Sequence, residues 1–402
     1  MILGLIAALA VLISGFIWGY APLRDKRVQA NNARFMAEFS AKAKEIDSKF
    51  SHHDTVVNGI KWHYVDQGPK DGTAIVFLHG LPEGWYSWRY VVPLIDPKYR
   101  VIAPDMKGYG RSDKTDSDYN WHVVARQTLE FVDSLGIDKF YVVGHDWGSL
   151  IGSVLVSDHP GRILGYVRMQ ADLLRPSTVT NWIKKPQFLL FQCKWLATYM
   201  MRDAEWFIDR VYPPRMQKPF DPVDRAYFIN EFSRPGVADQ VPNYFQTDNW
   251  DLEAALDKIC KGNFSFPIMI LQADSDPSQP VSIFEDVRRQ CPRVELRWIK
   301  DASHFSNLDQ PEEVARAVND FVHRARSGRS SSEMISLYTP AHRSTNPPYS
   351  PFTKGGNRTH VLPFIKGRQK GFWMVSGSSF LGAIRLQVAG PDQEGTAFGF
   401  VE

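Results

Sequence analysis

The sequence predicts an α/β protein in which helices flank a mostly parallel central sheet and a helical cap is inserted into the chain. Three observations carry this prediction. Short apolar runs alternate with amphipathic stretches from residue 50 to residue 326. The runs are apolar throughout, as in parallel strands that helices cover on both faces. Between residues 172 and 262 the strand pattern stops, and aromatic helical stretches replace it.

The first half of the core, residues 50–171, begins with a predicted hairpin. The stretch TVVNGIKWHYVDQG places Asn58-Gly59 between two alternating runs, which is a typical hairpin turn. Buried strands are expected in AIVFLHG and YRVIAPD, and an amphipathic helix ending at a glycine in WHVVARQTLEFVDSLG. FYVVGHD predicts the next strand, a helix follows to His159, and ILGYVRMQA predicts another strand.

The rest of the chain divides into three predicted parts. Residues 172–262 are expected to form the helical cap after the sixth strand, with stretches such as PQFLLFQCKWLATYMM. Residues 263–326 resume the α/β pattern, with strands in FPIMILQAD and VELRWIK and helices in VSIFEDVRRQ and PEEVARAVNDFVHRA. Residues 327–402 are rich in Ser, Pro and Gly and show no steady period, so we expect a disordered or irregular tail.

The N-terminal stretch, residues 2–21, is uncharged and long enough to cross a bilayer as one helix. Basic residues follow it, whereas a cleaved signal peptide normally carries them in front. We therefore expect a single-pass anchor in the lipid bilayer of the endoplasmic reticulum, with the domain that follows it in the cytosol. Two sequons, at Asn263 and Asn357, point the other way, and secretion after signal cleavage is the alternative. The basic residues are Arg24, Lys26 and Arg27.

Composition limits the classes of partner. The 402 residues include 47 basic and 44 acidic side chains, a net charge of +3, without a dense basic stripe interleaved with aromatics. Nucleic acid is therefore not an expected partner, and a small-molecule substrate is. Cys193, Cys260 and Cys291 are an odd number without CxxC spacing, so we expect free, mostly buried thiols. Neither a disulfide framework nor a metal site is indicated.

The stretch GHDWG, residues 144–148, has the form of a sharp strand-to-helix turn with a reactive side chain at its centre. A buried carboxylate is costly to desolvate, so we expect Asp146 to serve a chemical purpose. Gly144 and Gly148 relieve crowding at the turn, and N–H groups at the start of the helix favour an anion. The alternative is an aspartate that only caps the helix.

Three further stretches supply groups that a reacting carboxylate needs. HGLPEGWYSWR can donate the backbone N–H of Leu81, opposite that of Trp147, to form an oxyanion hole, and a cis bond is plausible before its proline. DASHFSNLDQPEEV places His304 after the last strand, where a base would overhang the edge of the sheet. LQADSDPSQP offers Asp274 and Asp276, and one of them can orient the imidazole.

Together HGLPEGWYSWR, PDMKGYGRSDK and GHDWGS resemble the α/β-hydrolase fold family, within it the branch of epoxide hydrolases and haloalkane dehalogenases with an aspartate nucleophile. The resemblance covers roughly residues 50–325 and is greatest to the epoxide hydrolases. It implies Asp146 as nucleophile, His304 as base and Asp276 as the acidic partner, because the family acid commonly precedes a proline such as Pro280.

The resemblance also implies a reaction: hydration of an apolar epoxide, lipid-derived or xenobiotic, to a vicinal diol without a cofactor. An alkyl ester forms on the aspartate and is hydrolysed by water that the histidine activates. By its place near the end of the cap, Tyr244 matches one of two family tyrosines that protonate the leaving oxygen. The other has no match at Gln187, so Tyr199 or another group serves, or Tyr244 acts alone. The expected pocket lining is Trp147, Phe188, Phe191 and Phe305.

Two other functions stay open at this point. A haloalkane or haloacid dehalogenase would use the same three residues, but Leu81 stands where haloalkane dehalogenases carry a polar donor. Trp147, and not the arginine of fluoroacetate-type relatives, follows the nucleophile. An idle, lipid-binding scaffold is the third hypothesis, and the intact set of Asp, Asp and His argues against it. The sequence therefore predicts an epoxide hydrolase.

Overall fold

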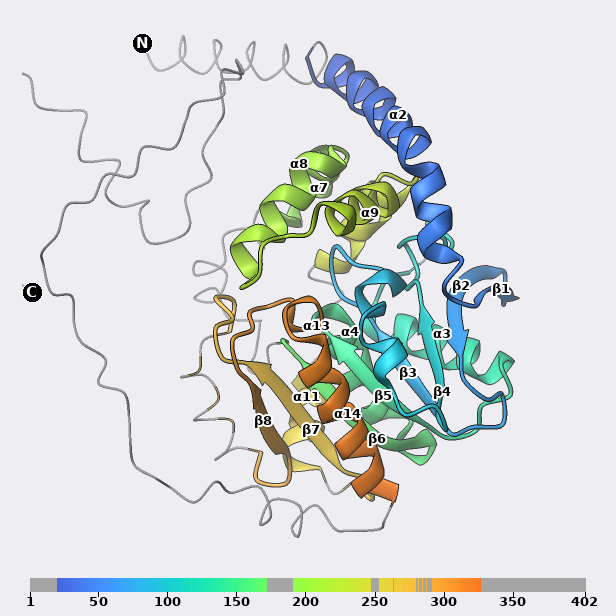
Figure 1. Ribbon diagram of the computed structural model, residues 1–402, viewed down its shortest axis with the longest axis vertical. Coiled ribbons are helices and arrows are strands. Elements are labelled where there is room, and N and C mark those ends of the chain that lie inside the picture. Colours follow the sequence, from blue (N-terminus) through green and yellow to red (C-terminus); the bar gives the residue numbers. More distant parts are fainter. Residues whose placement is uncertain are drawn as a thin grey trace, which may run out of the picture.

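An eight-stranded sheet forms the centre of the molecule (Figure 1). The computed structural model describes residues 20–116, 118–171, 191–246, 253–262, 264–279, 281, 284, 287 and 291–326. The strands are β1 His52–Val57, β2 Ile60–Gln67, β3 Ala74–Leu78, β4 Arg100–Pro104, β5 Phe140–His145, β6 Ile163–Met169, β7 Ile268–Ala273 and β8 Glu295–Ile299. They lie in the order β1-β2-β4-β3-β5-β6-β7-β8, in which β2 is antiparallel to both neighbours and all other pairs are parallel. The predicted α/β class with a mostly parallel sheet is confirmed.

The strands form where the sequence pattern indicates. The β1–β2 hairpin turns at Asn58 and Gly59, whose φ angles of 50° and 79° are the left-handed values that such a two-residue turn requires. Every residue of β3, β4 and β5 is buried, in agreement with their apolar sequences. Leu78 at the end of β3 pairs with Gly144 near the end of β5. The loops that follow these two strands therefore emerge side by side.

Helices cover both faces of the sheet (Figure 1). Among them, α3 Trp121–Ser134, α4 Trp147–Asp158 and α11 Glu253–Lys261 pack together on one face, and α14 Pro311–Arg326 packs against β6 and β7 on the other. The side chain of Asn120 caps α3 by accepting a hydrogen bond from the His122 N–H at 2.9 Å. Short helices in the loops are η2 Trp85–Trp88, η3 Val92–Leu94, η4 Pro160–Arg162 and α13 Ser306–Asp309.

A group of helices lies between β6 and β7 in the sequence and over the carboxyl ends of the strands in space (Figure 1). These are α7 Lys194–Met201, α8 Ala204–Val211, η5 Pro213–Arg215, α9 Pro222–Phe232, α10 Val237–Gln240 and η6 Val241–Phe245. They fall within the predicted cap, of which residues 172–190 and 247–252 lie outside the described part. The helix α11, also within the predicted range, packs against α4 of the core. The domain boundaries stay predictions.

A long helix to which the sequence analysis assigned no structure, α2 Ala21–Asp47, runs along the cap to the first strand (Figure 1). Near its start, Arg24 Nη1 donates to the carbonyl oxygen of Tyr199 in α7 at 2.7 Å. At its end, the Tyr227 hydroxyl of α9 donates to Asp47 Oδ1 at 2.6 Å. No helix within the described residues has the length and apolarity needed to span a membrane. The predicted anchor lies almost wholly outside them, as do the tail 327–402 and both sequon asparagines.

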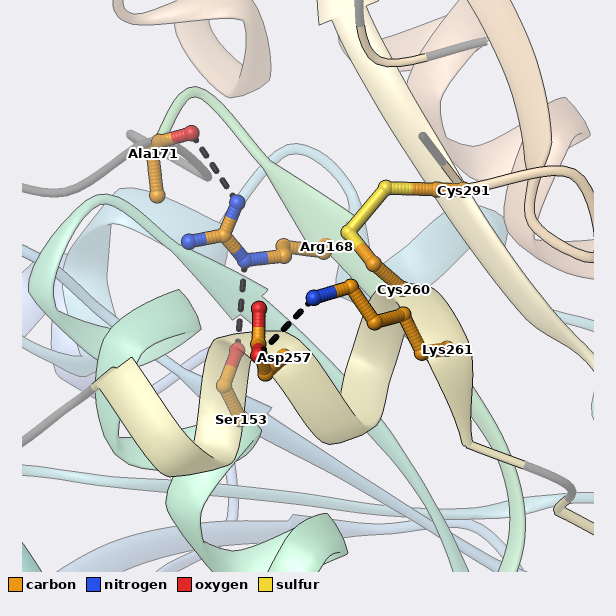
Figure 2. The surroundings of a disulfide bond; sticks show 7 residues. All are labelled: Ser153, Arg168, Ala171, Asp257, Cys260, Lys261 and Cys291. Atoms are coloured by element: carbon orange, nitrogen blue, oxygen red, sulfur yellow. Dashed lines mark hydrogen bonds and ion pairs between the residues drawn. A yellow bond between two sulfur atoms is a disulfide. The ribbon is translucent and has the colours of Figure 1, made fainter. Parts of the chain in front are cut away.

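The cysteines correct one expectation. Cys260 in α11 and Cys291 ahead of β8 form a disulfide, where free thiols were expected (Figure 2). Cys193 is free as expected, but it is exposed and not buried. The two bonded cysteines stand 31 positions apart in the sequence, with β7 between them, and they belong to no common local motif. The fold brings the two Cα atoms to 4.1 Å from each other, and the sequence spacing does not indicate this.

Candidate active site

Asp146 occupies the turn between β5 and α4. Its backbone has φ 48° and ψ −118°, a left-handed conformation that a non-glycine residue seldom adopts. A Cβ atom on Gly144 would lie 2.6 Å from the Gly148 carbonyl oxygen, and one on Gly148 would collide with the Leu78 carbonyl oxygen. Both positions therefore require glycine, as the sequence analysis proposed. The turn projects Asp146 from the carboxyl edge of the sheet.

The loop after β3 approaches the Asp146 carboxylate closely. The backbone N–H of Leu81 donates to Asp146 Oδ2 at 3.0 Å, and the Leu81–Pro82 bond is cis as expected. A side chain at Gly80 would collide with the carboxylate, because its Cβ would lie 2.7 Å from Oδ2. Trp147 opens α4 directly after Asp146, and its part in an oxyanion hole stays a prediction. One side of the predicted oxyanion hole thus has a donor in place.

His304 lies between the two predicted carboxylates. Its Nδ1 is 3.0 Å from Asp276 Oδ2, and its Nε2 is 3.7 Å from Asp146 Oδ1. Burial alone would raise the pKa of Asp276, but the charge of His304 and a hydrogen bond from it outweigh burial and lower that pKa. The Ser278 N–H also donates to Asp276, at 2.7 Å. Asp274 instead accepts from the N–H of Asp301 at 3.3 Å and takes no part in the set.

A second buried pair, Glu83 and His145, links the loops that carry Leu81 and His304. Glu83 Oε2 is 2.7 Å from His145 Nδ1 and accepts from the Gly80 N–H at 2.6 Å. His145 Nε2 lies 2.8 Å from the carbonyl oxygen of His304. Burial would lower the pKa of His145, but the charge and hydrogen bond of Glu83 raise it to about 9. This shift favours the imidazolium form of His145 at neutral pH, directly before Asp146 in the chain. The sequence analysis missed both residues, although they stand in the motifs HGLPE and GHDWG.

Tyr244 is completely buried, and its hydroxyl donates to the carbonyl oxygen of Lys107 at 2.8 Å. Its ring lies against Trp121, which stacks on Trp147 at 4.9 Å. The ring of Trp121 thus lies between Tyr244 and Trp147, the residue that follows Asp146. Its role as proton donor stays a prediction.

Two tyrosines to which the sequence analysis gave no role lie within electrostatic reach of the predicted nucleophile. Tyr212, at the end of α8, stacks on Phe305 at 4.2 Å, and its hydroxyl is 3.5 Å from the carbonyl oxygen of Pro82. Tyr109 has a buried hydroxyl without a hydrogen-bond partner among the described residues. Burial is the main cause that raises the pKa of each phenol well above its usual range, and the Asp146 charge adds to it. Tyr109 stands in the family motif PDMKGYGRSDK, whereas no sequence signal singles out Tyr212.

Several aromatic side chains lie around the site, and their role as the lining of a substrate pocket stays a prediction. Phe305 is fully buried, with its ring edge-on to His304 at 5.1 Å. Phe245 packs edge-on against Trp147 at 4.8 Å, and Phe191 packs on Phe245 at 4.6 Å. Phe188 lies outside the described residues. Within the described chain no group of three or more His, Cys, Asp or Glu side chains is placed to bind a metal.

The site thus combines a carboxylate with a backbone donor on one oxygen, an imidazole beside the other oxygen, and a second carboxylate behind the imidazole. This is the set of groups that covalent hydrolysis through an enzyme ester requires. A family model described as the alpha/beta hydrolase fold matches residues 73–311, which include all three side chains. The chain therefore belongs to the α/β-hydrolase fold family.

Relatives narrow this assignment. The chain is 37% identical over 324 residues to epoxide hydrolase 2 of Siraitia grosvenorii, covering 68% of this chain and 98% of that protein. It is 24% identical over 283 residues to human epoxide hydrolase 4, covering 66% and 76%. The epoxide hydrolase CorEH has the same fold, with a TM-score of 0.60 at 23% identity over 68% of this chain and 99% of that one. The haloalkane dehalogenase DbeA of Bradyrhizobium elkani also has this fold. Its TM-score is 0.59 at 22% sequence identity, and the match covers 70% of this chain and 100% of that one. Within its family, the chain belongs to the epoxide hydrolase branch.

Proposed function

We propose that the protein hydrates an apolar epoxide to a vicinal diol through an ester on Asp146. The observation that carries the proposal is the position of the Asp146 carboxylate, which lies 3.0 Å from the Leu81 N–H and 3.7 Å from His304 Nε2. An aspartate that only capped α4 would accept a hydrogen bond from a backbone N–H of the first turn, and no N–H of this helix donates to the Asp146 side chain.

The first step is the attack of one Asp146 oxygen on a carbon of the epoxide ring. The carbon–oxygen bond of the ring breaks, an alkyl ester forms on Asp146, and the released oxygen takes a proton from a phenol. A water molecule then loses a proton to His304 and attacks the Asp146 carbonyl carbon, while Asp276 holds the imidazole in the required tautomer. Collapse of the tetrahedral intermediate breaks the ester bond, the leaving oxygen takes the proton from His304, and the diol is released. The second proton of the water returns to the phenolate, which restores the starting state.

The backbone N–H of Leu81 and the carboxylate of Asp276 each stabilise the transition state of the second step. Negative charge develops on the Asp146 carbonyl oxygen, where the N–H of Leu81 is already within hydrogen-bond distance. A single donor of this kind typically contributes about 3 kcal/mol to transition-state stabilisation. Asp276 accepts from His304 and stabilises the imidazolium that forms after proton transfer.

A haloalkane dehalogenase would form the same ester but would release a halide. Leu81 offers only its backbone at the place where a polar side-chain donor would serve a halide, and its N–H already contacts Asp146. A phenol is needed only for the epoxide, and Tyr212 and Tyr109 both lie within electrostatic reach of Asp146. These contacts favour the epoxide as substrate.

Trapping the ester tests the proposal. In the full chain with His304→Gln, the second step should stall, because nothing activates the water. The variant is mixed with a fatty-acid or aryl epoxide and, separately, with a bromoalkane, and its peptides are analysed by mass spectrometry. We expect a covalent adduct on the peptide that contains Asp146 from the epoxide alone. The additional change Asp146→Asn is the control and should remove the adduct.

The other outcomes are equally informative. An adduct from the bromoalkane alone would make the protein a dehalogenase. No adduct from either compound, in a variant with an unchanged unfolding transition, would favour an idle binding scaffold. The full chain is required because α2 packs along the cap and its end contacts α9.

We also propose that the substrate partitions into membranes. The aromatic residues around Asp146 and the uncharged stretch 2–21 support this proposal. Rates that rise with the chain length of an epoxide series would support it further. Turnover of small water-soluble epoxides alone would contradict it.

A further inference from the structure

We propose that the start of α2 and the start of α7 together form a surface that lies in the headgroup region of a lipid bilayer. Eight large apolar side chains are exposed among the described residues, and three of them belong to this surface. They are Tyr20, Leu23 and Trp195, with exposed fractions of 55%, 70% and 48%, and we refer to them as the apolar patch.

A stack of side chains between the two helices places Trp195 of the apolar patch near the start of α2, where Tyr20 and Leu23 lie. The guanidinium of Arg24 lies 4.0 Å above the ring of Tyr199, and Trp195 stacks on Tyr199 with 5.5 Å between ring centres. Tyr20 precedes Arg24 by four residues, so the two side chains share a face of the helical chain. Two segments 175 residues apart thus present their aromatic and apolar side chains at one end of the molecule.

The position of the apolar patch points to a bilayer as its occupant. The chain immediately before Tyr20 consists of uncharged, mostly apolar residues, long enough to span a membrane. Any chain that inserts this stretch must hold Tyr20 and Leu23 at the membrane surface. Tyrosine and tryptophan are the residues that accumulate at that depth, with an apolar ring and a polar end.

Basic side chains next to the apolar patch fit the same occupant. Lys26, Arg27 and Lys194 are exposed, and none of the three forms an ion pair within the described part of the chain. Long basic side chains beside apolar surface reach the phosphate groups of lipids. The cap then faces the membrane, because α7 belongs to the cap helices. The 27 residues of α2 give this helix a length of about 40 Å. It runs from this end of the molecule towards β1 (Figure 1).

Cys193 provides a direct test, because it is exposed, free and two residues from Trp195. The full chain is labelled there with the fluorophore NBD and reconstituted into vesicles of phosphatidylcholine and phosphatidylserine, four to one. We expect blue-shifted emission that lipids with a doxyl group at acyl carbon 5 quench. The matched control carries the label at Val56→Cys in a Cys193→Ser background. Val56 is also exposed but lies beyond the opposite end of α2, and its label should emit as in water.

A double variant, Leu23→Glu with Trp195→Glu, tests the apolar patch itself. The lipid-quenched share of the Cys193 emission should fall about fivefold, with an unchanged unfolding midpoint. Quenching at Cys193 no greater than at Val56→Cys would overturn the proposal. A blue shift that grows with protein concentration and ignores the doxyl lipids would overturn it too, since the occupant would then be a second copy of the chain. Neither readout depends on epoxide turnover.

Discussion

At the scale of single residues, the pair Glu83–His145 makes a prediction about pH. The folded pKa of His145, about 9, is above the ordinary value of 6.5, so the pair stabilises the fold below pH 6.5 and this contribution is lost as pH rises through 9. The shift corresponds to ~3 kcal/mol. Urea unfolding of Glu83→Gln should therefore show a loss of about 3 kcal/mol at pH 6 and a smaller loss at pH 9. Glu295→Gln, which breaks the buried pair with Arg324, is the control, and its deficit should not shrink over the same range. Equal deficits for Glu83→Gln at both pH values would contradict the assignment.

The proton donor is the second question at this scale. Tyr212 contacts the Leu81–Pro82 loop and Phe305. The Tyr244 hydroxyl instead donates a hydrogen bond to the carbonyl oxygen of Lys107, and an aromatic ring lies between Tyr244 and the residue that follows Asp146. We expect Tyr212→Phe to slow ester formation from an epoxide by about 100-fold, because the leaving alkoxide loses its acid. Tyr244→Phe should slow it by less than tenfold. Single-turnover kinetics with a bromoalkane serve as the control, since a halide needs no proton. The reverse order of the two variants would return the role to Tyr244.

At the scale of elements, α2 is connected to the core and the cap through Asp47. This carboxylate accepts from Tyr227 of α9 and pairs with Arg111, which follows β4. Asp47→Asn should lower the free energy of unfolding by about 2 kcal/mol, since Arg111 then loses the nearer of its two carboxylate partners and keeps only the longer contact to Glu231 at 3.9 Å. Hydrogen exchange should accelerate in α2 but not in β3 or β5. Glu45→Gln on the same helix removes only an exposed contact to Lys42 and should leave the urea unfolding midpoint unchanged. Uniform acceleration over the sheet would show that α2 does not unfold independently.

The elements also show how far sequence reasoning reaches. The strands and the turn at Asp146 could be predicted because apolar runs and glycine-flanked turns have local causes. The set Asp146, His304 and Asp276 was assigned from the family resemblance, because the position of each residue after a strand leaves Asp274 and Asp276 equally open. The helix α2 was missed because its apolar positions are few and widely spaced. Tyr212 was missed because only the fold brings α8 beside the loop after β3.

At the scale of the whole molecule, the Cys260–Cys291 disulfide connects α11 to the segment before β8 (Figure 2). Strand β8 forms the edge of the sheet opposite β1. A bond that closes a loop of this length stabilises a fold by about 3 kcal/mol. Cys291→Ser should lower the free energy of unfolding by this amount under oxidising conditions. With excess reductant, the variant and the parent protein should unfold at the same urea concentration. Cys193→Ser, which removes the exposed free thiol, is the control and should leave stability unchanged.

The same bond makes a prediction about the side of the membrane. The basic residues after position 21 predict a cytosolic domain, but disulfides persist mainly in oxidising compartments, and Asn263 lies in a sequon near the bonded Cys260. We expect the oxidised pair in the native host, and with it a domain on the lumenal or extracellular side. Rapid alkylation of intact cells in denaturant, followed by mass spectrometry, should modify Cys193 and leave the other two cysteines unmodified. Endoglycosidase should then reduce the mass of the peptide that contains Asn263. Alkylation of all three thiols, with no glycan, would instead place the domain in the cytosol, where the reduced protein would fold with the lower stability predicted for Cys291→Ser.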